Sequence, residues 1–267
     1  MLEILQYSFM QNAFIAGMLI AVICSIIGVF LVLRRMSLIG DGLAHISFGG
    51  IAAGLFFGIY PLLSALLFAV LAALGIERLK KMKVYGDAAI AIFFSFGLAL
   101  GVVIISFSKG FTADLFSYLF GSILAVSAND LLFISALGIA TIAVIWAFYK
   151  ELLYITFDED SARASGIAVE RVNMLLIILT AMAVVISMRI VGILLVSSFI
   201  VIPASIALLL CKNFRQAMLV SVAIGVASSI LGLFASYYLN LAAGGAIVLV
   251  LVAVFFAALL YKKLYAK

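Results

Sequence analysis

The sequence predicts an all-α protein, a polytopic bundle of transmembrane helices that forms one domain over residues 1–267. Composition supports this first, since 68% of the residues are hydrophobic and only 10% are charged. The mean hydropathy is +1.42. A chain this apolar has more hydrophobic residues than the core of a soluble protein can bury. Charges are also absent from long stretches, and about 20 apolar helical residues cross ~30 Å of hydrocarbon. The lipid bilayer is therefore the first predicted partner.

The charge-free stretches of the first half predict four spans. The first runs from Ile4 to Leu33, and because its basic residues follow the apolar run instead of preceding it, the pattern differs from that of a signal peptide. The second covers about 37–58 and turns at Tyr60-Pro61 into the third. The third ends at the charged run 77–83, a cytoplasmic loop, and the fourth covers about 88–108.

The second half predicts the remaining spans. An interfacial stretch at 117–124, either a short helix or a re-entrant piece, leads to a fifth span at about 130–149. A polar segment at 150–171 follows. The run 172–210 fits two spans with a tight turn near Arg189, and 216–261 fits two more with a turn near 240–245. This layout gives eight or nine spans.

The orientation follows from the basic residues, which concentrate in cytoplasmic loops. With the N-terminus outside, every one of the 16 Lys and Arg residues except Lys109 and Arg189 lies on the cytoplasmic side of the cell membrane. Arg189 is expected at the outer end of the bundle, where it holds the turn. It should lie away from Asp41 and His45, the two ionisable residues of the second span that are discussed below. Its predicted contacts are open helix carbonyls or the carboxylate of Asp114 or Asp130.

Several function classes are excluded by the same sequence. The net charge of +5 is not gathered on a solvated domain, so nucleic acid is not a predicted partner. Cys24 and Cys211 lie in apolar runs and suit inert small hydrophobes. The sequence has neither a phosphate-binding Gly-x-x-x-x-Gly-Lys-Ser/Thr loop nor a His-Glu-x-x-His motif. We therefore expect a protein that is not an enzyme, with no catalytic residues and no cofactor of its own.

An acid and the only histidine stand out at the start of the second predicted span. Asp41 and His45 are one helical turn apart, so their side chains share one face. An ionisable pair inside an apolar span is a functional-site hypothesis. Imidazole nitrogen and carboxylate oxygen suit zinc, manganese and ferrous iron. The alternatives are a helix-start acid near the interface and a hydrogen-bonded histidine within the bundle.

The polar segment 150–171 contains a second candidate. Its acidic start and alanines suit a short cytoplasmic helix, because negative charge complements the helix dipole at the N-terminus. Gly166 is a plausible stop for this helix. A short cytoplasmic helix of this kind resembles the coupling helix with which permease subunits of ABC transporters contact their ATPases, and the resemblance implies coupling roles for Asp158, Glu159, Ala162 and Gly166.

Four patterns occur together along the chain: Ser-Leu-x-Gly-Asp-x-Leu-x-His at 37–45, the 118–124 stretch, the 158–166 helix, and the 189–204 segment with its Pro203-Ala204 end. In this order they resemble the permease subunit of zinc, manganese and iron ABC uptake transporters. The resemblance implies that Asp41 and His45 bind a divalent metal ion in transit. It also implies a homodimer, two copies of a separate ATPase that the 158–166 coupling helix contacts, and an extracytoplasmic metal-binding protein.

Two rival functions remain open at this stage. A proton- or ion-coupled secondary metal carrier would use Asp41 and His45 as a relay. A membrane scaffold would tolerate the loss of both residues. Which of the three metals is transported does not follow from the ligand types, since availability and delivery also contribute to selection.

Overall fold

The computed structural model describes residues 7–108 and 113–265, and among these it contains helices but no strands. Lys109, one of the two exceptions to the predicted charge distribution, lies outside the described residues. The helices are α1 Ser8–Leu33, α2 Ile39–Phe57, α3 Pro61–Lys81, α4 Gly86–Phe107, α5 Ala113–Phe120, α6 Ala128–Ala147, α7 Tyr149–Phe157, α8 Glu159–Ala164, α9 Val169–Ser187, α10 Val196–Leu210, α11 Phe214–Leu239 and α12 Ala243–Tyr265.

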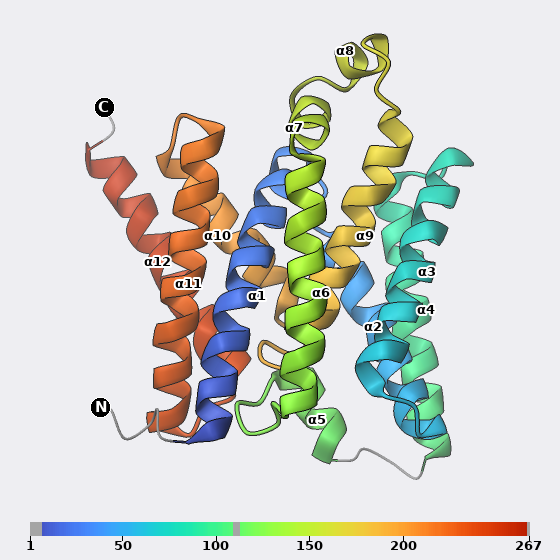
Figure 1. Ribbon diagram of the computed structural model, residues 1–267, viewed down its shortest axis with the longest axis vertical. Helices are drawn as coiled ribbons and strands as arrows, with labels where there is room; N and C mark the ends of the chain where they lie inside the picture. The colour runs from blue at the N-terminus through green and yellow to red at the C-terminus, as the bar shows by residue number, and fades with distance from the viewer. Residues whose placement is uncertain (1–6, 109–112, 266–267) are drawn as a thin grey trace.

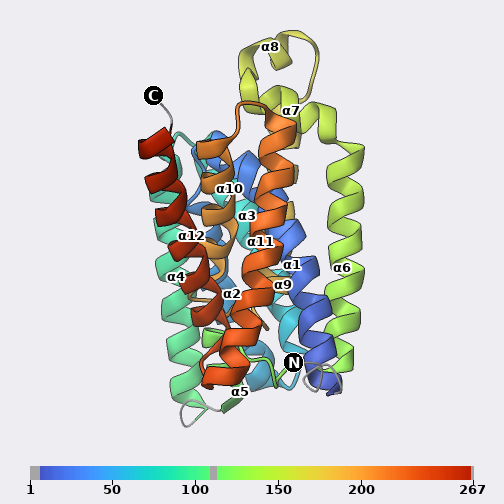
Figure 2. The same ribbon diagram turned by 90° about the vertical axis from the view of Figure 1, so that its left-hand side faces the viewer.

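The long helices lie side by side along one axis, with α5 at one end of the bundle and α7 and α8 at the other (Figures 1 and 2). Within the described residues, eight helices are long and apolar enough to cross a membrane, and α10, with 15 residues, is shorter. Because α1 begins at the α5 end and α12 finishes at the opposite end (Figure 1), the number of crossings is odd. The short helix α10 therefore completes a ninth crossing.

The basic segments gather at one end of the molecule. The end that carries α7 and α8 also carries the connection between α10 and α11 and the last turn of α12 (Figure 2). Lys and Arg concentrate on the cytoplasmic side of membrane proteins, so this is the cytoplasmic end. The grouping agrees with the orientation predicted from the sequence.

The element bounds agree with the predicted spans, with three differences. The interfacial stretch forms the short helix α5, followed by a non-helical segment. The polar segment contains α7 as well as the expected α8, because the apolar residues Leu152 and Ile155 are buried on one face of α7. The expected tight turn at Arg189 is present but longer, because successive turns occupy residues 188–195 between α9 and α10.

The 188–195 connection packs inside the bundle against residues 118–122. Its residues Met188, Ile190, Val191 and Ile193 are buried. Non-helical backbone within a membrane protein requires internal hydrogen-bond partners. Three bonds supply them across the two segments: Ser122 N to Arg189 O at 3.1 Å, Ile193 N to Tyr118 O at 2.9 Å and Leu194 N to Leu119 O at 3.3 Å.

A glycine allows this close pairing. Gly192 has φ +84°, and a Cβ there would lie 2.5 Å from the carbonyl oxygen of Leu119. Both the left-handed conformation and the backbone approach exclude larger residues. The sequence pattern did not predict this contact, since it depends on two segments that are far apart in the chain.

Candidate functional site

Helix α2 carries the predicted metal ligands and is the most enclosed of the long helices in the described part of the chain. It packs mainly against α4 and α3, with further contacts to α9 and α10. Asp41 lies in its first turn and His45 one turn later, and both side chains are half-buried. The pair therefore lies in the cytoplasmic half of the bundle, on one face of its central helix.

Helix α4 fixes the surroundings of His45. The ring of Phe94 lies 4.0 Å from the imidazole, centroid to centroid, at an angle of 51°. One turn further along α4, a Cβ on Gly97 would lie 2.2 Å from the Cα of Ile46 and 2.6 Å from the carbonyl oxygen of His45. The two helix backbones therefore touch at the histidine, and any side chain at position 97 would force them apart.

The Nδ1 atom of His45 is buried and has no hydrogen-bond partner among the described residues. Buried polar atoms in proteins are nearly always hydrogen-bonded, so an unpartnered one needs an explanation. A neutral imidazole nitrogen is a metal ligand, and Asp41 on the same face offers carboxylate oxygens. The arrangement can bind a divalent cation through one nitrogen and one carboxylate from this chain.

No third strong ligand accompanies the pair within the described part of the chain. Among residues 7–108 and 113–265, no group of three or more His, Cys, Asp and Glu side chains is placed to hold a metal ion. Two ligands make a weak site. A transit site must release its ion, so weak binding suits transport better than storage. A second copy of the chain could also supply the remaining ligands.

A recess of about 470 Å³ opens at the cytoplasmic end beside the start of α2. Arg35, Ser37, Lys80 and Asp87 contribute its polar lining, and Ile39 at the beginning of α2 contributes to its wall. The recess thus lies next to the helix turn that carries Asp41. Neither Asp41 nor His45 is among the described residues that line the recess.

Helix α8 matches the predicted cytoplasmic helix. The carboxylate of Asp158 accepts a hydrogen bond from the backbone N–H of Ser161 at 2.9 Å and so caps the helix. Hydrogen bonds from Ser161 hold the pKa of Asp158 below its usual value, which keeps the cap charged. Gly166 follows the helix with φ +84° and has nothing within 4 Å of a Cβ position.

The four residues predicted for coupling do not share one surface. Asp158 and Gly166 are exposed and Glu159 is half-buried, whereas Ala162 is fully buried. The exposed residues can face a partner protein. Ala162 instead packs inward, so its role within α8 is to hold the helix against the rest of the chain.

The outer end contains a polar cluster around Asp130, whose side chain is 1% exposed. The Nε atom of Arg189 lies 3.0 Å from the Asp130 carboxylate, and the hydroxyl of Tyr60 donates to it at 2.6 Å. The guanidinium also stacks on the ring of Tyr118 at 4.3 Å. The predicted partner of Arg189 is confirmed, and the sequence did not indicate that Tyr60 and Tyr118 take part.

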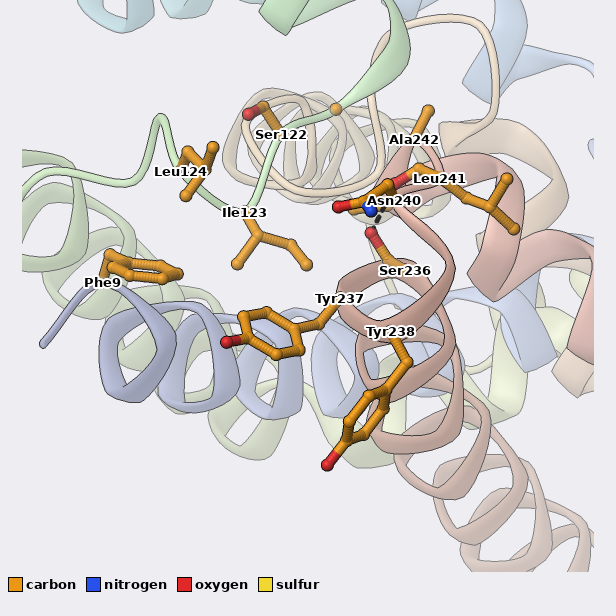
Figure 3. A pocket seen from close by; sticks show the side chains of 12 residues that line it. Phe9, Ser122, Ile123, Leu124, Ser236, Tyr237, Tyr238, Asn240, Leu241 and Ala242 are labelled. Atoms are coloured by element: carbon orange, nitrogen blue, oxygen red, sulfur yellow. Dashed lines mark hydrogen bonds between the residues drawn. The ribbon is translucent and has the colours of Figure 1, made fainter. Parts of the chain in front are cut away.

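The outer end also contains a pocket of about 560 Å³, which lies beside the turn between α11 and α12 (Figure 3). Phe9, Tyr237 and the 122–124 segment surround it, and the Ser236 hydroxyl donates to the carbonyl of Leu241 at 2.6 Å. No acid and no histidine is among the described residues that line it. The described lining of the pocket therefore lacks the carboxylate and imidazole ligands that the candidate site on α2 offers.

Comparison with known proteins gives consistent matches over nearly the whole chain. Residues 6–262 match the family model described as the ABC 3 transport family. The manganese transport system membrane protein MntC of Listeria monocytogenes is 38% identical over 259 residues, 97% of this chain and 92% of that protein. The manganese import system permease protein ScaB of Streptococcus gordonii is 40% identical over 91% of this chain and 87% of its own length.

Solved structures agree with the fold. A chain of PsaBC from Streptococcus pneumoniae, solved in complex with Fab, superposes with a TM-score of 0.87 at 35% identity and covers 98% of this chain and 96% of that chain. An inward-facing conformation of a metal-chelate type ABC transporter gives a TM-score of 0.75 at 18% identity over 95% of this chain and 86% of that chain. The second likeness concerns the fold alone.

Proposed function

Because the chain belongs to the ABC 3 transport family, we propose that it is the membrane-spanning permease subunit of an ATP-driven importer of divalent transition-metal ions. In this function the ion passes along a path lined by a dimer, and a separate ATPase supplies the energy. The sequence contains no phosphate-binding loop of its own. The partners are therefore ATP-binding cassette subunits at the cytoplasmic end and a metal-binding protein at the outer end.

The observation that carries the proposal is the position of Asp41 and His45 on α2. They are a carboxylate and an imidazole on one face of the most enclosed long helix, and the Nδ1 of His45 has no partner among the described residues. This combination suits a transient metal ligand. A buried ring nitrogen without a protein partner is uncommon for a purely structural histidine.

Manganese is the ion that we propose to test first, because similar proteins from two genera are named as manganese transport or import proteins. One nitrogen and one carboxylate per chain suit manganese, zinc and ferrous iron alike. A second copy of the chain would double this set to four ligands. Because each chain contributes only two of them, the ion would still dissociate easily. Zinc and iron are therefore the comparison ions.

The proposed energy input is ATP hydrolysis transmitted through α8. This helix projects from the cytoplasmic end (Figure 1), and its exposed residues are available to a partner. The rival function, a secondary carrier driven by an ion gradient, has no support from the family match.

The two functions are separated by reconstituting the complete complex, with its ATPase and binding protein, in liposomes. We expect manganese uptake that requires ATP and stops when the ATPase is omitted. Uptake by the permease alone, driven by a proton or sodium gradient, would contradict the proposal and support the carrier. Zinc and iron under the same conditions establish the order of preference.

A further inference from the structure

Arg34 is a cytoplasmic arginine that the bundle has buried. Its side chain is 8% exposed, although it follows the last residue of α1 at the water-facing end. The adjacent Arg35 is exposed, as expected for a basic loop residue. Burying a guanidinium is costly unless its charge and its donors are satisfied. The surroundings of Arg34 therefore need an explanation beyond membrane orientation.

Two other helices supply partners for this guanidinium. Its Nη2 lies 2.9 Å from the carboxylate of Glu159, the first residue of α8. Its Nη1 donates to the side-chain oxygen of Asn173 in α9. Burial lowers the pKa of Arg34, and the negative charges of Glu159 and of Glu77 in α3 oppose that effect. One side chain thus joins the end of α1 to the beginning of the proposed coupling helix.

The backbone connects Arg34 to the helix that carries Asp41 and His45, the proposed metal ligands. Residues 34–38 connect α1 to α2 as a hydrogen-bonded turn. The N–H of Met36 donates to the carbonyl of Leu31 at 2.9 Å, and the N–H of Asp41 donates to the carbonyl of Leu38 at 3.1 Å. These hydrogen bonds tie the turn that carries Arg34 to the first turn of α2.

The other ion pair of Glu159 provides a contrast. Arg163 lies 3.8 Å from the same carboxylate within α8, and its side chain is 63% exposed. An exposed pair within one helix contributes little and links no second element. Of the two described pairs, only the one with Arg34 connects α8 to the segment that leads to Asp41.

We propose that Arg34 is a positioning residue that transmits movement of α8 to the metal ligands on α2, through its ion pair with Glu159 and the turn 34–38. The inference rests on the proposed function. It assigns Arg34 a role in coupling ATP hydrolysis to release or capture of the ion. It assigns no direct contact of Arg34 with either the ion or the ATPase.

The test uses the complete complex in liposomes and measures manganese ions transported per ATP hydrolysed. Arg34→Gln should lower this ratio about tenfold or more, which corresponds to the loss of one charge-assisted hydrogen bond. ATPase binding should persist, because Arg34 is buried. Lys81→Gln is the matched control, since it breaks an exposed ion pair, 3.1 Å from Lys81 Nζ to Glu170, that does not include α8, and it should keep the wild-type ratio.

Two further variants keep the test decisive if Arg34→Gln does not assemble. Glu159→Gln breaks the link from the α8 side and should lower the ratio, whereas Glu170→Gln removes an exposed acid of α9 that pairs with Lys81 and should not. A wild-type ratio in either link variant overturns the inference. Absence of ATP-dependent uptake by the wild-type complex would instead contradict the proposed function.

Discussion

At the scale of single residues, the buried salt bridge between Arg189 and Asp130 is the main ion pair described at the outer end. Its two side chains are 15% and 1% exposed. Removing one partner of such a pair leaves the other charge buried and uncompensated. The bridge therefore maintains the junction between α6 and the 188–195 connection.

We expect Arg189→Ala to lower the stability of the assembled protein by about 3–5 kcal/mol. Arg189→Lys should be milder, because it keeps the charge but loses the stacking of the guanidinium on Tyr118. The measurement is thermal unfolding of the detergent-purified complex. Arg163→Ala, at an exposed pair, is the control, and equal stability of the Arg189 and Arg163 alanine variants would contradict this account.

Gly97 offers a second test at the residue scale, because its missing side chain lets α4 touch α2 at His45. A Cβ there would lie 2.2 Å from the Cα of Ile46, so Gly97→Ala must separate the two helices, at a typical cost of about 1–3 kcal/mol. We predict weaker manganese uptake. Gly245→Ala, where a Cβ meets nothing within 4 Å, should leave uptake unchanged, and equal uptake by both variants would refute the predicted role of this contact.

Asp41 and His45 could be predicted from the sequence because an acid and a lone histidine at helical spacing stand out in an apolar span. Arg34 could not, since a basic residue after a span is typical of any cytoplasmic loop. Its burial depends on Glu159 and Asn173, which are more than 120 positions away. Such a contact leaves no periodic signal in one sequence.

At the scale of the elements, the sequence predicted the order of the helices well, since charge-free runs and basic loops mark where each helix begins and ends. It predicted a turn near Arg189 but not the length of the 188–195 connection. An apolar run looks the same whether it continues as a helix or breaks into turns. The non-helical form is stabilised by the backbone bonds to 118–122 and by Gly192.

Helix α8 carries the prediction that belongs to this scale. We expect Gly166→Trp to uncouple ATP hydrolysis from uptake, because a large side chain would obstruct the close approach of the ATPase. Position 166 has φ +84°, so the substitution also strains the backbone. Gly58→Trp controls for that strain, since Gly58 has φ +67°, open space around it and a place at the other end of α2.

Co-purification of the ATPase and the ratio of ions to ATP are the two readouts for these tryptophan variants. The Gly58 variant should behave like the wild type in both. Uncoupling by both variants to the same extent would show that backbone strain, and not contact with the partner, causes the effect.

At the scale of the whole molecule, the fold separates two ends with different tasks. The outer end holds the buried Arg189 bridge, and the cytoplasmic end holds α8, Arg34 and the recess beside α2. Asp41 and His45, the proposed metal ligands, lie in the cytoplasmic half, on the most enclosed long helix of the described chain. This arrangement suits the proposed import driven from the cytoplasmic side, because the proposed ligands lie in the half of the bundle that carries α8.

The central claim is that Asp41 and His45 bind the ion in transit, and ATP-driven manganese uptake by the reconstituted complex tests it most directly. Asp41→Asn and His45→Ala each remove a ligand without adding charge to the membrane. We predict that uptake falls to background in both, while assembly with the ATPase persists. Asp114→Asn, the same change at an exposed position in α5, should retain uptake. Near-wild-type uptake by both ligand variants would contradict the claim.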